Sequence, residues 1–180
     1  MAMTATEKAR MKEIKERYPF DLKAFVKSAS AIHVAEDKEN NSIAVTDGYK
    51  GFLYNDIKQV LSDMEFIMGC NLFYRDKLEY NRFKQMIIDA AHERMERSDM
   101  CLKKGKSVLT FFYSKNALVG VNEEYADMLG DYDIVYGNDG THPIVGMYED
   151  KPGIFFLILP VRWLRSKQQY DAVCKYHGVD

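Results

Sequence analysis

Five segments rich in β-branched and aromatic residues follow one another in the second half of this chain, separated by mostly short connections. The segments cover residues 107–113, 117–121, 133–136, 143–148 and 153–159. Parallel strands need crossover connections of a dozen or more residues, whereas antiparallel strands need only a turn. The sequence therefore predicts an antiparallel sheet of about four or five strands in the C-terminal half, with helices packed against it.

Helical periodicity dominates the N-terminal half. Thr4 and Glu7 have the spacing of a capping box, and Pro19 ends the helix that follows them. Apolar residues recur at helical spacing in three further segments, which are residues 22–29, 55–68 and 76–98. The last of these is predicted to be the longest helix of the chain.

Strand signals in the first half are few. Residues 31–35 and 42–46 are predicted to be short strands joined by a polar turn. The Gly48–Gly51 segment is predicted to turn the second strand into the next helix, because glycines commonly mark such turns. The fold class that results is α+β, with a helix-rich N-terminal half and a sheet in the C-terminal half.

The organisation of the chain indicates a single domain, residues 1–180. There is no internal repeat and no linker rich in proline, glycine or serine. A change of pattern near Ser107 leaves open a helical subdomain 1–106 and a sheet-containing subdomain 107–180. In the helix predicted for residues 55–68, Phe66 lies opposite the main apolar stripe, so either a second layer covers it or it contacts a partner.

The composition of the chain indicates where the protein is expected to reside in the cell and which cofactors it is not expected to bind. The N-terminus has no apolar signal-peptide core, and the longest apolar run, residues 154–159, is too short to span a bilayer. The three cysteines, Cys70, Cys101 and Cys174, are widely spaced and form no zinc-binding pattern. We therefore expect a cytoplasmic protein that binds no membrane and carries no metal or cofactor.

Charge is distributed very unevenly along the chain. The formal net charge is only -2, yet residues 116–150 contain no lysine or arginine. The same segment contains eight acidic residues, which are Glu123, Glu124, Asp127, Asp131, Asp133, Asp139, Glu149 and Asp150. It also contains four tyrosines, which are Tyr125, Tyr132, Tyr136 and Tyr148.

Clustered carboxylates can imitate a phosphate backbone, and tyrosines supply rigid contact area in interfaces. The leading hypothesis is a non-enzymatic inhibitor that blocks a nucleic-acid-processing enzyme by occupying its basic groove. Small counter-defence proteins of phages and mobile elements are an analogous class. The predicted partner-binding residues are Glu123, Glu124, Tyr125, Asp127, Asp131, Tyr132, Asp133 and Tyr136. A solvated loop region at the edge of the sheet is the structural alternative.

Two other functions remain open. Basic residues crowd the first helix, at Lys8, Arg10, Lys12, Lys15 and Arg17, and the Lys103–Lys106 turn, which is typical of a nucleic-acid-binding regulator. Asp133, Glu149 and Lys151 have the order found in Mg²⁺-dependent nucleases, where two carboxylates hold the metal and the lysine helps to activate water. The second pattern is short, and Glu149 falls in a predicted turn.

Overall fold

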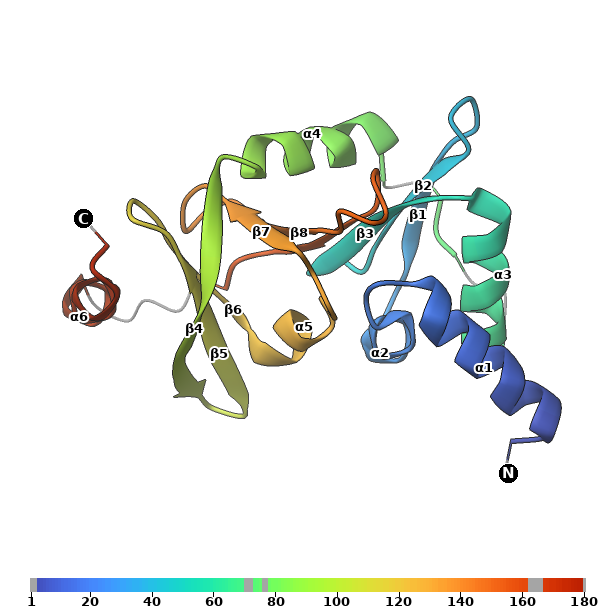
Figure 1. Cartoon of the computed structure of the whole chain (residues 1–180), viewed down its shortest axis with the longest axis horizontal. Coiled ribbons are helices and arrows are strands. Elements are labelled where there is room, and N and C mark those ends of the chain that lie inside the picture. The colour runs from blue at the N-terminus through green and yellow to red at the C-terminus, as the bar shows by residue number, and fades with distance from the viewer. Residues whose placement is uncertain (1–2, 70–72, 76–77, 162–166, 180) are drawn as a thin grey trace.

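The computed structural model describes residues 3–69, 73–75, 78–161 and 167–179 (Figure 1). In these residues, nine strands form one antiparallel sheet in the order β1-β2-β3-β9-β8-β7-β4-β5-β6. The strands are β1 (His33–Asp37), β2 (Ser42–Thr46), β3 (Lys50–Asn55), β4 (Glu93–Lys104), β5 (Ser107–Tyr113), β6 (Leu118–Asn122), β7 (Ile134–Gly137), β8 (Ile144–Met147) and β9 (Phe155–Ile158). The helices are α1 (Ala5–Arg17), α2 (Leu22–Ser28), α3 (Ile57–Met68), α4 (Tyr80–Ala90), α5 (Glu123–Asp127) and α6 (Lys167–His177).

The α+β class and the antiparallel arrangement are confirmed, but the predicted strand number was too low. The sheet is larger because β3, from the first half of the chain, pairs with β9, the last strand, through Lys50–Ile158 and Leu53–Phe155. That pairing joins β1, β2 and β3 to the C-terminal strands. The N-terminal half is therefore only partly helical.

Two stretches differ from the structure predicted for them. The Gly48–Gly51 segment lies in a hairpin between β2 and β3, so it leads into a strand and not into a helix. Residues 93–98 belong to β4, the longest strand, and the helix before it ends at Ala90. Glu, Arg and Met favour helices locally, but β7 and β5 supply hydrogen-bond partners along β4, and this pairing overrides the local preference.

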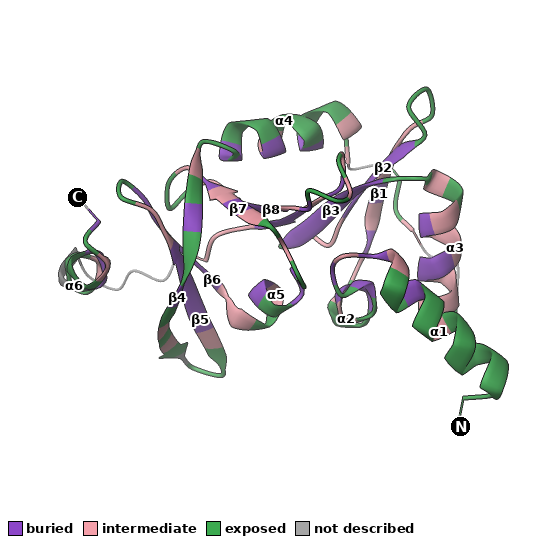
Figure 2. Ribbon diagram, in the orientation of Figure 1, coloured by how far each residue is buried: buried purple, intermediate pink, exposed green. Residues whose placement is uncertain are grey.

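Helices cover both faces of the sheet (Figure 1). On one face α4 packs through Phe83, Ile87 and Ala90 against apolar residues of the central strands. On the other face α1, α2, α3 and α5 enclose the largest core, which includes Phe25, Phe52 and other fully buried side chains. Figure 2 shows that buried residues concentrate in the strands between these layers. The α6 helix packs separately, against β5 and β6.

The helix α1 begins and ends as predicted. The Thr4 hydroxyl accepts from the Glu7 backbone N–H, and the Glu7 carboxylate accepts from the Thr4 N–H, so the capping box is complete. The helix α3 ends at Gly69, whose φ of 72° is the left-handed conformation expected for a C-terminal glycine. Phe66 is half-buried, and the Arg10 guanidinium of α1 lies 4.5 Å from its ring centroid, so a second layer covers it.

Strand predictions in the second half are confirmed at β5 to β9, and the short helix α5 lies between β6 and β7. The last helix, α6, packs Val173 and Cys174 against residues of β5 and β6. The residues just before it lie outside the described part of the chain. None of the described helices is long and apolar enough to cross a membrane.

Candidate functional site

The helix α5 carries the first group of predicted partner-binding acids. Asn122 caps it by accepting the Glu124 N–H at 3.0 Å. Glu124 and Asp127 are both exposed and lie one helical turn apart on the same face. Glu123 points elsewhere, because its carboxylate accepts a hydrogen bond from the Cys101 thiol of β4 at 3.2 Å.

A second group of acids lies where β7 begins and β8 ends. Asp133 precedes β7, and its carboxylate accepts the backbone N–H of Glu149 at 2.6 Å. The Asp133 N–H in turn donates to the Met147 carbonyl oxygen at 3.1 Å, which extends the β7–β8 ladder. Residues far apart in the chain are thereby held side by side, and Asp150 follows Glu149 directly.

Asp131 joins the two groups, because it lies four residues after Asp127 and two before Asp133. We refer to this surface as the acidic band; its members are Glu124, Asp127, Asp131, Asp133, Glu149 and Asp150, and all six are exposed. Within the described residues, one of the six has an ion-pair partner, since Asp127 contacts Arg97 at 2.7 Å. The band therefore carries a local excess of negative charge that its own fold does not neutralise.

Two acidic-segment residues lie away from the band. Asp139 sits beyond the other end of β7, where it accepts hydrogen bonds from Thr141 and His142. These bonds hold the pKa of the Asp139 carboxyl well below its usual range. Val135 packs in the largest core, on the face of the sheet that α5 covers. Because side chains alternate along a strand, the neighbouring Tyr136 lies on the opposite face.

The remaining tyrosines of the acidic segment stabilise the fold. The Tyr148 side chain is buried, and its hydroxyl donates to the Leu129 carbonyl oxygen at 2.6 Å. Tyr132 is half-buried against the main core. The Tyr125 ring lies 4.4 Å from the Lys50 ammonium, and burial raises the pKa of its hydroxyl. The side chains of all three tyrosines are therefore engaged within the fold of the protein.

Tyr49 is an exposed tyrosine that sequence reasoning missed. It lies in the β2–β3 hairpin and is 63% exposed. Its hydroxyl and the Glu124 carboxylate are both close enough to Tyr125 to influence the pKa of that residue. The sequence signal was the turn itself, because connecting segments usually run over the surface and Tyr49 lies directly after Gly48.

Gly130 places the acidic band against the turn between α1 and α2. Its φ is +64°, and a Cβ atom there would lie 2.2 Å from the Pro19 carbonyl oxygen. The Asp21 N–H also donates to the Met128 carbonyl oxygen at 2.9 Å, so the two segments are in direct contact.

The substitution Gly130→Ala is expected to lower the free energy of unfolding by about 2–3 kcal/mol, because it adds a steric overlap to the left-handed backbone cost. Gly105→Ala is the matched control. Gly105 has a φ of +63° but nothing within 4 Å of the added Cβ, so we expect a loss of about 1 kcal/mol. Chemical denaturation of both variants measures the difference, and equal losses would show that the Pro19 contact is unimportant.

The basic residues of the first helix divide into two sets. Arg10 and Arg17 face α3, where Arg10 donates to the Ser62 hydroxyl at 2.9 Å and Arg17 pairs with Asp63. Lys8, Lys12 and Lys15 are exposed. The turn at residues 103–106 joins β4 to β5, and Figure 1 shows it apart from α1. The structure therefore does not bring the two predicted basic clusters together.

The nuclease-like residues are engaged in structural contacts. Asp133 and Glu149 do lie side by side, but the Asp133 carboxylate accepts a backbone N–H. The Lys151 ammonium donates to the Arg17 carbonyl oxygen at 2.7 Å and so points toward α1. In the described part of the chain, no group of three or more histidine, cysteine, aspartate or glutamate side chains is arranged to hold a metal ion.

A serine–histidine contact joins α6 to the irregular part of β4. The Ser98 hydroxyl and the His177 Nε2 atom are 3.0 Å apart, a distance suited to a nucleophile and its base. Burial lowers the pKa of His177, and its ring stacks on Tyr113 with centroids 4.3 Å apart. Ser98 is 7% exposed and also accepts the Met100 N–H. Among the described residues, no carboxylate hydrogen-bonds to the His177 ring, so this contact fastens α6 to the sheet.

Comparisons with known proteins give no family. No family model matches the sequence, and no curated protein matches it. A crystal structure from Eubacterium rectale ATCC 33656, provisionally named a DNA polymerase III beta subunit, is similar over 81% of this chain, with 14% sequence identity and a TM-score of 0.37. The chain spans 64% of that protein. Similarity at this level supports no statement about function.

Proposed function

We propose that this protein acts by binding another macromolecule through the acidic band, without catalysis of its own, in the cytoplasm of its host. The partner class that fits best is a nucleic-acid-processing enzyme, because a row of carboxylates can occupy a groove built for phosphates. In its sharper form the protein is an inhibitor, analogous to the small counter-defence proteins of phages and mobile elements.

One observation carries the proposal. Six exposed carboxylates come from three segments of the chain, and the Asp133–Glu149 hydrogen bond holds two of these segments together. Within the described residues a single ion pair, Asp127–Arg97, offsets the six charges. Carboxylates held this close repel one another, so a basic partner would relieve that repulsion as well as gain attraction. Tyr49, which like Glu124 acts on the pKa of Tyr125, offers such a partner an exposed aromatic side chain.

The test reverses charges that make no structural contact. Glu124→Lys, Asp131→Lys and Asp150→Lys change the band while leaving the Asp127–Arg97 and Asp133–Glu149 contacts in place. A tagged protein is used to capture partners from host lysate, and the captured proteins are identified by mass spectrometry. We expect capture of a nucleic-acid-binding enzyme, release of that enzyme by added duplex DNA, and loss of capture by the triple variant.

The matched control carries the same total charge change elsewhere. Glu13→Lys, Glu39→Lys and Glu79→Lys replace exposed acids outside the band. This control is expected to capture the same enzyme at the level of the unaltered protein. The proposal fails if the band variant still captures it, or if both triple variants lose it equally.

A further inference from the structure

A hollow of about 410 Å³ lies between α1 and α2, beside the turn that contacts Gly130. Its floor is apolar and is made by Met11, Ile14, Phe20 and Leu22. The last three belong to the main core and are at most 3% exposed, whereas Met11 is half-buried. A volume of this size is within the range of pockets that hold a ligand group.

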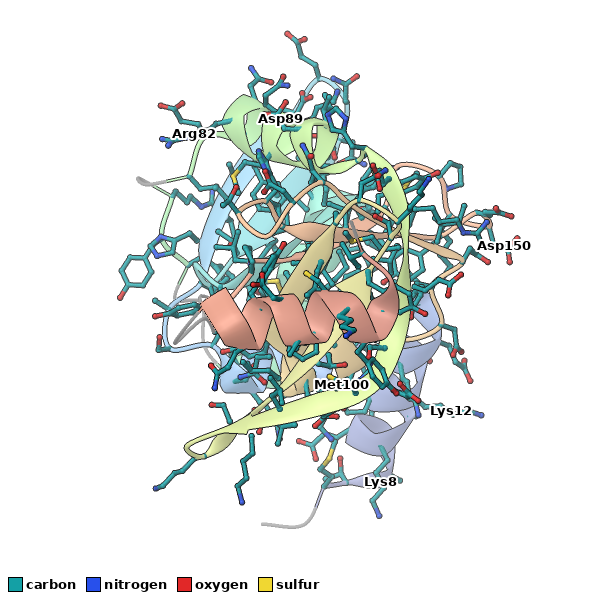
Figure 3. The ribbon with its side chains drawn as sticks, turned by 90° about the vertical axis from the view of Figure 1, so that its left-hand side faces the viewer. Lys8, Lys12, Arg82, Asp89, Met100 and Asp150 are labelled. Carbon is teal, nitrogen blue, oxygen red and sulfur yellow. The ribbon has the colours of Figure 1, made fainter. Side chains whose placement is uncertain are left out.

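Lysines stand on both walls of this hollow. Lys12 and Lys15 come from α1 and Lys23 from α2, and all three are exposed. Figure 3 shows Lys12 projecting outward from α1. Lys12 has a weak contact with Glu16 at 3.7 Å. In the described part of the chain, Lys15 and Lys23 have no carboxylate within ion-pairing distance. We call the hollow and these three lysines the lysine groove.

One carboxylate also lines the lysine groove, but it is already engaged. Asp21 caps α2, and its Oδ1 atom accepts the Ala24 N–H at 2.9 Å. Asp21 and Glu16, the carboxylate that contacts Lys12, supply two negative charges against the three lysines, so the rim keeps a net positive charge. The groove therefore combines an apolar floor with a rim that attracts negative charge.

We propose that the lysine groove binds an acidic peptide segment of a partner protein, with one large apolar side chain in the hollow and carboxylates against the lysines. Cations on opposite walls suit several carboxylates spaced along an extended chain. A small molecule with a single carboxylate would engage one wall only. The lysine groove and the acidic band share no residue, so this proposal goes beyond the function proposed above and the two can be tested with separate variants.

The probe is a fluorescein-labelled synthetic peptide, DEDFED, whose phenylalanine is flanked by acids. Fluorescence anisotropy should show binding that weakens with added salt. The variant Lys12→Glu, Lys15→Glu and Lys23→Glu is expected to weaken binding by about tenfold or more, because it reverses the rim. Replacing the phenylalanine of the peptide by alanine should also weaken binding about tenfold, because the hollow then stays unfilled.

A control variant separates the groove from general charge. Lys58→Glu, Lys84→Glu and Lys106→Glu make the same charge change at exposed positions on α3, α4 and the β4–β5 turn. It should bind the peptide within about twofold of the unaltered protein. The proposal is overturned if both variants lose peptide binding equally, or if the groove variant still binds the peptide. It is also overturned if replacing the phenylalanine of the peptide by alanine leaves the affinity unchanged. No binding by the unaltered protein at about 1 mM peptide overturns it as well.

The acid-band variant distinguishes this proposal from the proposed function. Glu124→Lys, Asp131→Lys and Asp150→Lys leave the lysine groove intact, so that variant should still bind the peptide while losing its basic partner. The groove variant should show the reverse pattern. Circular dichroism spectra that match the unaltered protein confirm that both variants remain folded.

Discussion

Replacing Lys50 by methionine is expected to lower the free energy of unfolding by about 3–5 kcal/mol, because it removes one partner of a buried ion pair. The Lys50 side chain is 0% exposed and pairs with the Asp47 carboxylate, which is 4% exposed. Its ammonium also lies 5.1 Å from the Phe25 ring centroid and 4.4 Å from that of Tyr125. Methionine would fill much of the space but leave the Asp47 charge without its cation.

The position of Lys50 explains why the effect should be large. Asp47 Oδ1 accepts hydrogen bonds from the backbone N–H groups of Tyr49 and Lys50, each at 2.9 Å. Asp47 Oδ2 accepts a hydrogen bond from the Lys50 ammonium. The pair thus holds the β2–β3 hairpin under α2 and α5. An uncompensated carboxylate in this place costs far more than a lost surface contact.

Chemical denaturation followed by circular dichroism measures the loss. Lys58→Met, at an exposed site on α3, is the matched control and should change stability by less than about 0.5 kcal/mol. Adding Asp47→Asn to Lys50→Met should restore part of the loss, because the buried negative charge is then gone. If Lys50→Met costs less than about 1 kcal/mol, the buried ion pair does not stabilise the β2–β3 hairpin.

Asp63→Ala is expected to cost about 3–4 kcal/mol, because Asp63 is the buried acceptor that ties α1 to α3. Its side chain is 1% exposed and pairs with Arg17. It also accepts the Tyr18 hydroxyl at 3.1 Å and the Gln59 amide at 3.0 Å. Arg17 is partly exposed and can be hydrated after the change, whereas the Tyr18 hydroxyl stays buried without its acceptor.

Two smaller substitutions separate the contribution of the Tyr18 hydrogen bond from that of the Arg17 ion pair with Asp63. Tyr18→Phe removes only the hydroxyl and should cost about 1 kcal/mol. Asp63→Asn keeps the shape but removes the charge that Arg17 faces, and it should fall between the other two variants. The expected order of unfolding midpoints in urea is therefore Tyr18→Phe highest and Asp63→Ala lowest. An Asp63→Ala variant as stable as Tyr18→Phe would contradict the role given to the ion pair.

The candidate site could be predicted only in part, because charge along a chain does not specify charge in space. The eight acids were evident in the sequence, but their grouping depended on tertiary contacts. The Asp133–Glu149 hydrogen bond brought two of them together, while Asp139 was separated by the length of β7. The tyrosines show the same limit, since Tyr148 of the acidic segment is buried whereas Tyr49, from a different hairpin, is exposed.

The lysine groove was also beyond sequence reasoning. Lys12, Lys15 and Lys23 were visible as basic residues of a helical region, but nothing local indicates that α1 and α2 leave a hollow between them. The angle between two helices depends on the side chains that pack at their contact. Here that contact includes the turn at Pro19, which Gly130 approaches from another part of the chain.

Local interactions were sufficient wherever an element is stabilised within its own segment. The capping box of Thr4 and Glu7 and the end of α3 at Gly69 both follow from short-range spacing. The strands β5 to β9 could be recognised from their residue types and the turns between them, although each one pairs with other strands. Long-range pairing decided the rest. The strand β3 became part of the sheet through β9, and β4 became a strand because β5 and β7 satisfied its backbone hydrogen bonds. A strand depends on partners distant in the sequence, whereas a helix satisfies its own backbone, so the errors fell on strands.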